Sequence, residues 1–223
     1  MTKGIIFDLD GTLIDSAPDL HAISNAVLAA HGHEPLTLQT VTSFIGNGIP
    51  KLVERCFKAA NDPLEGEALD NAITMFLEKY AKEPAKHSTF YPGVLETLDK
   101  LKDQGFVLGI CTNKTEAMAT LIVDKMGISS YFACVAGGDR IKEKKPAPEP
   151  LINCAREMGC TPEDIIFVGD SETDAATAEN ASVSFILFTE GYRKVLASEL
   201  YHHALYCRFS HLPHLVRHVA IQD

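Results

Sequence analysis

The sequence predicts an α/β protein with a parallel sheet, on two observations. First, five short segments rich in β-forming residues are almost continuously apolar, as strands buried on both faces of a parallel sheet are. These segments are residues 4–7, 106–111, 132–135, 165–168 and 184–188. Second, from residue 91 onward helical periodicity alternates with these strands, which predicts repeated right-handed crossovers.

Three of the four expected helices from residue 91 onward end at glycine stop signals. Residues 92–104 place Leu95, Leu98 and Leu101 at a three-residue step, and Gly105 follows. The other three expected helices span residues 114–126, 148–158 and 171–181.

Residues 16–87 interrupt this rhythm, because they show helical periodicity and no convincing strand. Apolar stripes predict helices over residues 16–30, 50–60 and 66–80. We therefore predict a helical cap domain, residues 16–87, inserted into a core domain made of residues 1–15 and 88–223. The hinges should lie near Asp15 and His87, and Asp15 and Asp19 should cap or solvate the first cap helix.

Composition excludes several classes of protein. The 223 residues carry 20 basic and 30 acidic side chains, a net charge of −10, and 46% of them are hydrophobic. A disordered chain would be less hydrophobic. An acidic chain is a poor partner for nucleic acid or an anionic membrane surface. No apolar run approaches the roughly 20 residues that span a bilayer.

The first residues and the cysteines together indicate a cytoplasmic protein. An aspartate stands as early as Asp8, which does not fit the apolar stretch of a signal peptide. The six cysteines are dispersed with no Cys-x-x-Cys pair, so we expect reduced thiols that serve mainly as small core residues. The sequence carries no signal for an oligomeric state.

Charged or hydroxyl side chains follow four of the predicted strands. Asp8 and Asp10 follow the first, Thr112 follows the second, Lys145 lies after the third, and Asp170 follows the fourth. In an open parallel sheet, ligands bind beyond the carboxyl ends of the strands, so these side chains are expected to share one site.

The residue types in this site predict phosphoryl chemistry. Carboxylates that lie close together require a cation or protons, and oxygen ligands favour Mg²⁺. A carboxylate facing a phosphoryl group can act as a nucleophile, while Mg²⁺ and Lys145 neutralise the phosphoryl oxygens. A second carboxyl group two residues on can protonate the leaving oxygen and then deprotonate water.

The four motifs, taken together and in order, resemble those of the haloacid dehalogenase superfamily. They are Asp8-x-Asp10-Gly11-Thr12, Thr112 after its strand, Lys145-Pro146-x-Pro148, and Gly169-Asp170-Ser171-x-x-Asp174. The resemblance implies a Rossmann-like three-layer core with the strand order 5-4-1-2-3. It also implies an α-helical cap inserted after the first motif.

The resemblance also implies a role for each motif residue. Asp8 would be the nucleophile and Asp10 the general acid/base. Mg²⁺ would be held by Asp8, the backbone carbonyl of Asp10, and Asp170. The phosphoryl oxygens would be held by Thr112, the backbone N–H of Asn113, and Lys145. Asp174 would orient Lys145 or support the metal site, and Ser171 would either cap the last helix or support the site.

Within the superfamily the sequence is most similar to phosphoglycolate phosphatases, in residues 44–48, 52–55, 91–94 and 137–139. The implied function is a Mg²⁺-dependent phosphatase that hydrolyses a small phosphate monoester, with phosphoglycolate the leading candidate. A sugar-phosphate phosphatase or phosphomutase is the alternative, and a non-catalytic phosphate-binding module is a distant one. A nicotinamide-binding protein is disfavoured, because no Gly-x-Gly-x-x-Gly follows the first strand.

Three other features of the sequence can each be interpreted in two ways. The loop of Gly46, Asn47 and Gly48 either faces the phosphate or is a simple turn between helices, and Asn47 or Lys51 would read a substrate carboxylate in the first case. Arg140 and Glu172 depart from the family pattern and either alter specificity or are neutral. The C-terminal histidines form a zinc site or, the favoured interpretation, lie on a solvated or partly packed final helix. They are His202, His203, His211, His214 and His218.

Overall fold

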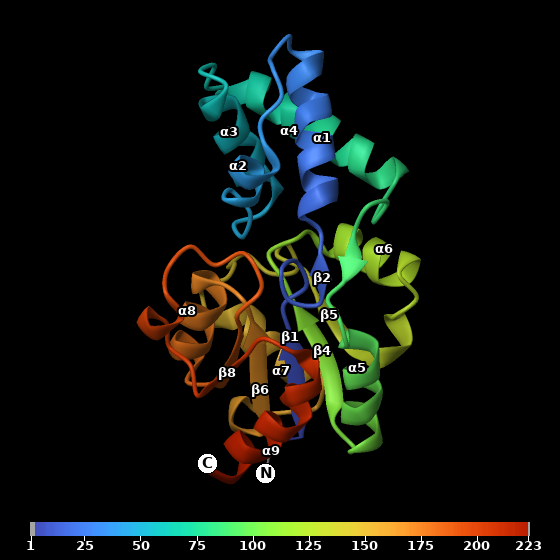
Figure 1. Ribbon diagram of the computed structural model, residues 1–223, viewed down its shortest axis with the longest axis vertical. Helices are drawn as coiled ribbons and strands as arrows, with labels where there is room; N and C mark the ends of the chain where they lie inside the picture. The colour runs from blue at the N-terminus through green and yellow to red at the C-terminus, as the bar shows by residue number, and fades with distance from the viewer. Residues whose placement is uncertain (1–2, 223) are drawn as a thin grey trace.

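A six-stranded parallel sheet forms the centre of the computed structural model, which describes residues 3–222 (Figure 1). Its strand order is β5-β4-β1-β6-β7-β8. The strands are β1 (Gly4–Phe7), β4 (Val107–Cys111), β5 (Phe132–Ala136), β6 (Ile165–Gly169), β7 (Ser184–Phe188) and β8 (Ala204–Tyr206). Numbered 1 to 5 along the chain, the first five strands are β1, β4, β5, β6 and β7. Read across the sheet from β7 to β5, their order is the predicted 5-4-1-2-3. The three-residue strand β8 extends the edge beyond β7 and was not predicted.

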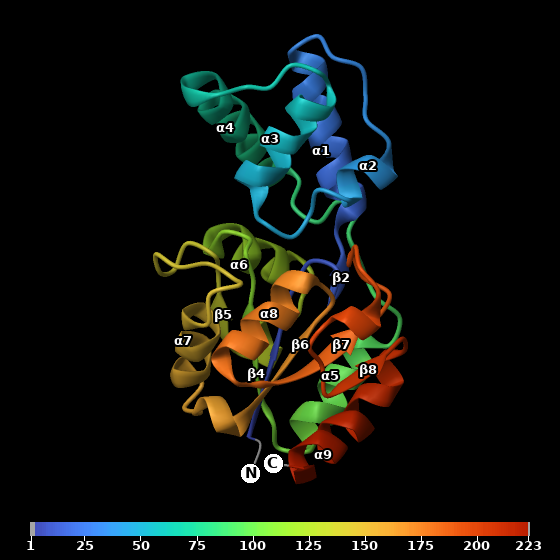
Figure 2. The same cartoon turned by 90° about the vertical axis from the view of Figure 1, so that its left-hand side faces the viewer.

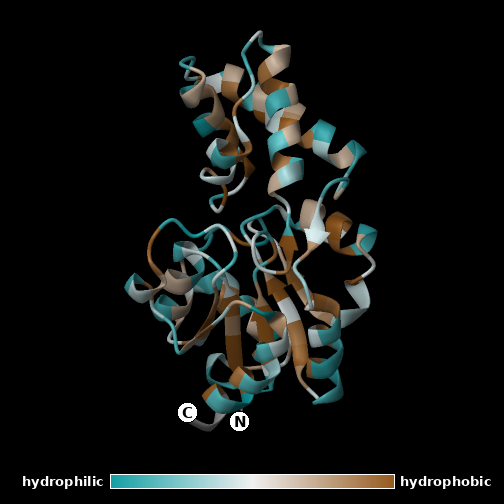
Figure 3. Ribbon diagram, viewed as in Figure 1, coloured by the Kyte–Doolittle hydropathy of each residue, from teal (hydrophilic) through white to brown (hydrophobic). Residues whose placement is uncertain are grey.

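Helices cover both faces of the sheet, so the predicted three-layer α/β architecture is confirmed (Figure 2). On one face lie α5 (Val94–Asp103), α6 (Glu116–Lys125) and α9 (Leu212–Gln222), and on the other lie α7 (Glu149–Glu157) and α8 (Glu172–Ala181). Successive residues of β1 point to opposite faces: Ile5 and Phe7 join one buried cluster and Ile6 the other. Figure 3 shows the strands of the sheet as mainly hydrophobic ribbons between helices of mixed character.

The helix between residues 92 and 104 differs from the prediction in one residue. Leu98 and Leu101 are fully buried, but Leu95 is 39% exposed. A helix of 3.6 residues per turn rotates a strict three-residue step away from the buried face, which explains the difference.

Helices α1 to α4 form a separate group beyond the carboxyl ends of the strands (Figures 1 and 2). They are α1 (Ala17–Ala30), α2 (Leu38–Thr42), α3 (Ile49–Ala59) and α4 (Gly66–Lys82). The short helix α2 was not predicted. Their apolar stripes pack together, with Val27, Phe57 and Phe76 almost completely buried. Whether residues 16–87 form a domain of their own stays a prediction.

The two connections to this helical group lie side by side. Strands β2 (Ile14–Asp15) and β3 (Thr89–Phe90) pair antiparallel, and two-residue strands leave no periodicity in a sequence. Asp19 is buried rather than solvated, and its carboxylate accepts hydrogen bonds from the backbone N–H groups of His87 and Ser88, both at 2.8 Å. Of the two expectations for Asp19, to cap or to solvate the first cap helix, solvation is therefore excluded, and the carboxylate instead joins α1 to the second connection.

The remaining local features agree with the simpler interpretations. All six cysteines are free thiols and five are buried, while Cys207 is exposed and so departs from the core prediction. His214 and His218 lie exposed on α9, and among residues 3–222 the one group of side chains suited to a metal contains no histidine. Over the same residues, no helix has the length and apolarity needed to cross a membrane. Short 3₁₀ helices occupy Ser129–Tyr131, Pro162–Asp164, Ala197–Glu199 and Phe209–His211.

Candidate active site

Three neighbouring strands deliver three of the predicted side chains to one edge of the sheet. Asp8, Thr112 and Asp170 directly follow β1, β4 and β6, which lie next to one another in the order β4-β1-β6. Lys145 reaches the same place from the loop between β5 and α7, where its Nζ lies 3.0 Å from Asp8 Oδ1. The structure therefore brings the predicted residues together.

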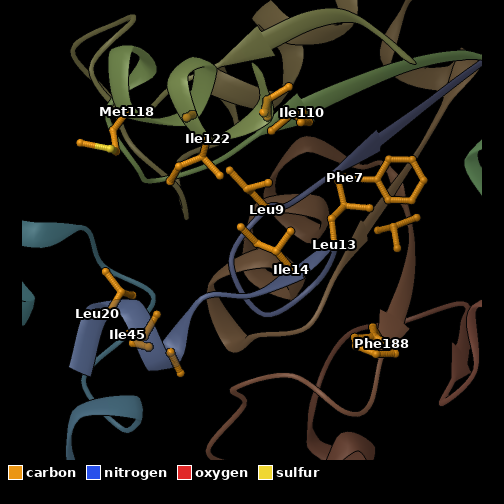
Figure 4. Packing of buried hydrophobic residues seen from close by; sticks show 14 of the residues in the cluster. Phe7, Leu9, Leu13, Ile14, Leu20, Ile45, Ile110, Met118, Ile122 and Phe188 are labelled. Atoms are coloured by element: carbon orange, nitrogen blue, oxygen red, sulfur yellow. The ribbon is translucent and has the colours of Figure 1, made fainter. Parts of the chain in front are cut away.

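The apolar residues between the acidic ones fix the first loop. Leu9 and Leu13 are fully buried, and Leu9 lies toward Ile110 and Ile122 while Leu13 lies beside Phe7 (Figure 4). Alternation along the chain then turns Asp8 and Asp10 the other way, into the cavity that they line.

Asp8 is nearly buried, and its surroundings favour a proton. Burial is the main cause that raises the pKa of its carboxyl group to about 7, and the negative charges of Asp174 and Asp10 add to it. The Lys145 ammonium acts in the opposite direction. Without a further cation, a fraction of Asp8 is protonated at neutral pH.

Lys145 is held between two carboxylates. Its Nζ lies 2.6 Å from Asp174 Oδ1 and 3.0 Å from Asp8 Oδ1. Burial alone would lower the pKa of Lys145, but Asp174 and Asp8 outweigh it and hold the pKa above its usual range. Lys145 is therefore a fixed positive charge beside Asp8.

The helix α8 begins with a capping box that fixes Asp174. The Ser171 hydroxyl accepts the backbone N–H of Asp174, and Asp174 Oδ2 accepts the backbone N–H of Ser171 at 3.1 Å. Ser171 is thus the N-cap residue of α8, as one of its two interpretations expected. Because the same Asp174 orients Lys145, the helix terminus positions the lysine.

Asp170 is fixed by one donor on each carboxylate oxygen. Thr12 Oγ1 donates to Oδ1 at 2.7 Å, and the Tyr192 backbone N–H donates to Oδ2 at 2.6 Å. Burial, with the nearby charges of Asp174 and Asp8, raises the pKa of Asp170 well above its usual value. Gly11 leaves room for this carboxylate: with φ of +87°, its missing Cβ would lie 2.5 Å from Asp170 Oδ2.

The charges in this cluster suit a divalent cation. Asp8, Asp170 and Asp174 each offer a carboxylate oxygen within 4.8 Å of the others, and all three are buried. Lys145 is their ammonium partner, so two negative charges lack compensation. Asp174 already balances the Lys145 ammonium at 2.6 Å, whereas both donors to Asp170 are neutral groups, which leaves Asp8 and Asp170 as the side chains best placed to hold the ion. A hard ion such as Mg²⁺ prefers carboxylate and carbonyl oxygens of this kind.

Asp10 occupies a second charge pair next to this cluster. Its Oδ2 lies 3.1 Å from Lys114 Nζ, and its Oδ1 accepts a hydrogen bond from Ser16 Oγ at 2.5 Å. Burial would lower the pKa of Lys114, but Asp10 and Tyr80 more than reverse this and raise it. Sequence reasoning gave Lys114, Ser16 and Tyr80 no role in the site. Lys114 follows Thr112 and Asn113 at a strand end, which was the available signal, whereas Tyr80 is remote in the chain and gave none.

A cavity lies between the strand ends and the helical group. Its core side is formed by Asp8, Asp10, Thr112, Asn113 and Lys114. Its other side is formed by residues of α1, α3 and the loop before α3, namely Leu20, Ile45, Gly46, Gly48, Ile49 and Leu52. The loop of Gly46 and Gly48 is thus both a connection between helices and a wall of the cavity.

The loop facing the site is bound to the core through its backbone. Asn113 Nδ2 donates to the Gly46 carbonyl at 3.1 Å, and Lys194 Nζ lies 3.3 Å from the Ile45 carbonyl. Asn47 does not line the cavity, because it is exposed and its Oδ1 accepts a hydrogen bond from Arg55 at 2.8 Å. Lys51 is also exposed and pairs with Glu54. Neither side chain is placed to read a substrate in this arrangement.

The comparison with known proteins agrees with this geometry. Residues 5–188 match the family model described as "Haloacid dehalogenase-like hydrolase". The chain belongs to this family. A phosphoglycolate phosphatase from Cereibacter sphaeroides is 42% identical over 216 residues, which cover 97% of this chain and 98% of that protein. The prediction of a hydrolase of this superfamily, similar to phosphoglycolate phosphatases, is confirmed.

Solved structures give the same assignment. A predicted phosphoglycolate phosphatase from Haemophilus somnus 129PT superposes with a TM-score of 0.90 at 31% identity, covering 96% of this chain and 98% of that one. A β-phosphoglucomutase from Clostridium difficile has a TM-score of 0.80 at 16% identity, covering 100% and 98%, and shows a shared fold. The predicted enzyme class, a phosphoric monoester hydrolase similar to phosphoglycolate phosphatases, is supported by the family and by the 42% identical relative.

The two departures from the family pattern lie outside the cavity of this hydrolase. Arg140 pairs with Glu116 at 2.5 Å and also with Glu157, so its guanidinium fixes the loop between β5 and α7. Glu172 accepts the backbone N–H groups of Lys194 and Val195, and so holds the loop that follows β7. Both residues stabilise loops in this structure, and neither lines the cavity.

Proposed function

We propose that this hydrolase is a Mg²⁺-dependent phosphatase that acts on a small phosphate monoester, with phosphoglycolate the leading candidate. The observation that carries the proposal is the Asp8 carboxylate, which lines the cavity 3.0 Å from Lys145 and beside Asp170. The 42% identical relative named phosphoglycolate phosphatase supports the choice of substrate.

Asp8 is the proposed nucleophile. One of its carboxylate oxygens attacks phosphorus, the bond from phosphorus to the ester oxygen breaks, and an aspartyl phosphate forms. Asp10 gives a proton to the departing alcohol oxygen. In the second step Asp10 takes a proton from water, whose oxygen attacks phosphorus and releases inorganic phosphate and the Asp8 carboxylate.

The neighbouring residues hold the transferred group. The Thr112 hydroxyl, the Asn113 backbone N–H and the Lys145 ammonium supply donors to the phosphoryl oxygens. Asp8, Asp170 and the backbone carbonyl of Asp10 would hold Mg²⁺, which when bound supplies positive charge for the phosphoryl oxygens. Asp174 keeps Lys145 beside Asp8.

The helical group, residues 16–87, is the proposed cap domain. It contributes apolar side chains to the cavity, which exclude water from the reacting groups. The cavity volume is about 40 Å³, and one water needs roughly 10–15 Å³, so only a few waters fit. A phosphate ester therefore enters when the cap domain moves away, and the paired connections β2 and β3 are the place for that motion.

A phosphomutase has less support from the cavity. Such an enzyme must rebind a bisphosphate intermediate, and within the described residues no lysine or arginine of residues 16–87 lines the cavity. The small volume of the cavity and the apolar residues on its cap side favour a compact phosphate ester as the substrate. The two alternatives are a sugar-phosphate phosphatase, which the assay below separates, and a non-catalytic phosphate-binding module. A cytoplasmic location stays a prediction.

One set of assays tests the function. The purified protein with Mg²⁺ is offered phosphoglycolate, several sugar phosphates and an activated aryl phosphate, and kcat/KM is compared. We expect the highest value for phosphoglycolate; a higher value for a sugar phosphate would replace the substrate, and no turnover at all would favour the non-catalytic module. Asp8→Asn should abolish turnover, whereas Asp99→Asn, an exposed change remote from the site, should leave it unchanged. More than a few per cent of normal activity in Asp8→Asn would overturn the nucleophile assignment.

A further inference from the structure

Lys114 connects a carboxylate of the core to a phenol of the helical group. Its Nζ lies 3.1 Å from Asp10 Oδ2 and donates to the Tyr80 hydroxyl at 3.0 Å. The same ammonium stands 4.7 Å from the centre of the Tyr80 ring, within the range of a cation–π contact. Tyr80 lies near the end of α4 and is fully buried.

The burial of this connection makes its geometry well defined. The Lys114 side chain is 2% exposed and the Asp10 side chain 14% exposed. A buried ion pair has strong orientation preferences, because an unpaired charge there is costly. Asp10 has one donor on each oxygen, Lys114 on Oδ2 and Ser16 on Oδ1, so its carboxyl plane is determined by two side chains.

Lys114 and Lys145 occupy different positions in the site. Lys145 lies against Asp8 and Asp174, whereas Lys114 lies against Asp10 and Tyr80. The two lysines therefore serve the two carboxylates of the first motif separately.

We propose that Lys114 is a positioning residue for Asp10, and that Tyr80 makes this positioning depend on the placement of the helical group. When α4 is docked as seen here, Tyr80 holds Lys114 against Asp10, so the proton donor is oriented only while the cavity is covered. This inference rests on the proposed function, since it assigns Asp10 the proton transfer.

The choice of leaving group separates this role from a merely structural one. An alkyl phosphate needs a proton on its departing oxygen, whereas a nitrophenolate departs without one. General acid catalysis contributes about 10²–10⁴-fold, so a misplaced Asp10 should slow alkyl esters far more than aryl esters. A general loss of folded enzyme would slow both classes equally.

The test measures kcat and KM in Lys114→Met, Lys114→Arg and Tyr80→Phe for three esters: an alkyl phosphate whose alkyl group is uncharged, the carboxylate-bearing phosphoglycolate, and p-nitrophenyl phosphate. We expect Lys114→Met to lose at least about tenfold more activity on the alkyl ester than on the aryl ester. Tyr80→Phe should show the same bias to a smaller degree, and Lys114→Arg should restore part of it because it keeps the charge. The matched controls are Lys102→Met and Tyr131→Phe, which alter a similar lysine–tyrosine contact on the surface of the core.

Two results would overturn the inference. Equal losses on both ester classes would make Lys114 structural, and a loss confined to the KM of carboxylate-bearing esters would make it a substrate ligand. A crystal structure of Lys114→Met tests the inference without an activity assay. The Asp10 carboxyl group should be rotated in that structure, and an unchanged orientation would also overturn the inference. If the wild-type protein turns over none of the three esters, the proposed function fails, while the crystal structure still decides the position of Asp10.

Discussion

Asp174 Oδ1 accepts a hydrogen bond from Lys145 Nζ at 2.6 Å, and both side chains are almost completely buried. The other oxygen of the same carboxylate accepts the Ser171 hydroxyl at 2.6 Å, at the start of α8. One helix terminus therefore determines where the ammonium beside Asp8 lies.

Asp174→Asn should reduce turnover strongly without unfolding the protein. The neutral amide keeps an acceptor for the α8 cap but loses the charge that balances Lys145. Residues that orient an active-site group commonly contribute about 10–100-fold, and we expect a fall of kcat/KM in that range. Glu179→Gln, an exposed change on the same helix, is the control. Equal activity in the two variants would show that Lys145 needs no partner.

Gly11→Ala tests the space around Asp170. The new Cβ would lie 2.5 Å from Asp170 Oδ2, so we expect Mg²⁺ affinity to fall by more than about tenfold. Gly105→Ala is a closely matched control, because its φ of +86° is almost the same as the +87° of Gly11 but no atom lies within 4 Å of the added Cβ.

Both variants should lose about 1–2 kcal/mol of stability from backbone strain alone. Calorimetric titration with Mg²⁺ then separates the two positions. An unchanged affinity in a folded Gly11→Ala protein would contradict the placement of the metal at Asp170.

The sheet and the principal site residues were predictable because they depend on local sequence. Buried parallel strands leave continuous apolar runs, and the residue after each run is carried to one edge of the sheet, which brought Asp8, Thr112 and Asp170 together. Strand β8 escaped prediction because it is short: the three residues Ala204–Tyr206 give too little pattern to separate a strand from a loop.

The contacts between distant segments were not predictable from one sequence. Asp19 was expected to cap or solvate α1, but it is buried, and the second connection, at His87 and Ser88, donates to it. Tyr80 and Lys114 meet through tertiary packing although they are 34 positions apart in the sequence. Such pairs have no fixed spacing, so neither propensity nor periodicity reveals them.

Asp19→Ala should weaken the joint between the two connections. The carboxylate accepts two backbone N–H groups and the Ser88 hydroxyl, and hydrogen bonds to a charged group contribute roughly 1.5–3 kcal/mol each. We expect the free energy of unfolding to fall by roughly 2–4 kcal/mol in urea titrations, since water replaces part of the loss. Glu83→Gln removes an exposed acidic partner of Lys86 and should change stability little. A similar stability in both variants would contradict the structural role of Asp19.

Mg²⁺ binding should tighten as pH rises toward neutrality. Burial raises the pKa of Asp8 in the metal-free protein to about 7, so below that pH the ion must displace a proton. Each proton released makes Kd fall about tenfold per pH unit. Asp8 contributes one between about pH 5 and about pH 7, and Asp170, whose pKa burial also raises, adds to the fall.

The titration of Asp8 also affects the stability of the metal-free protein, which should fall as pH rises, whereas Mg²⁺ affinity increases. Because the folded pKa of Asp8 lies above its unfolded value of 3.8, the unfolded chain binds fewer protons between these limits. Stability in EDTA should therefore decrease as pH rises from about 4 to about 7, and saturating Mg²⁺ should offset this decrease. Thermal unfolding with and without Mg²⁺ measures both effects.

Glu163→Gln, a change at a remote exposed carboxyl group, should leave the pH dependence of the Mg²⁺ effect intact. An affinity that does not vary with pH below about 7 would mean that Asp8 is already ionised before Mg²⁺ binds.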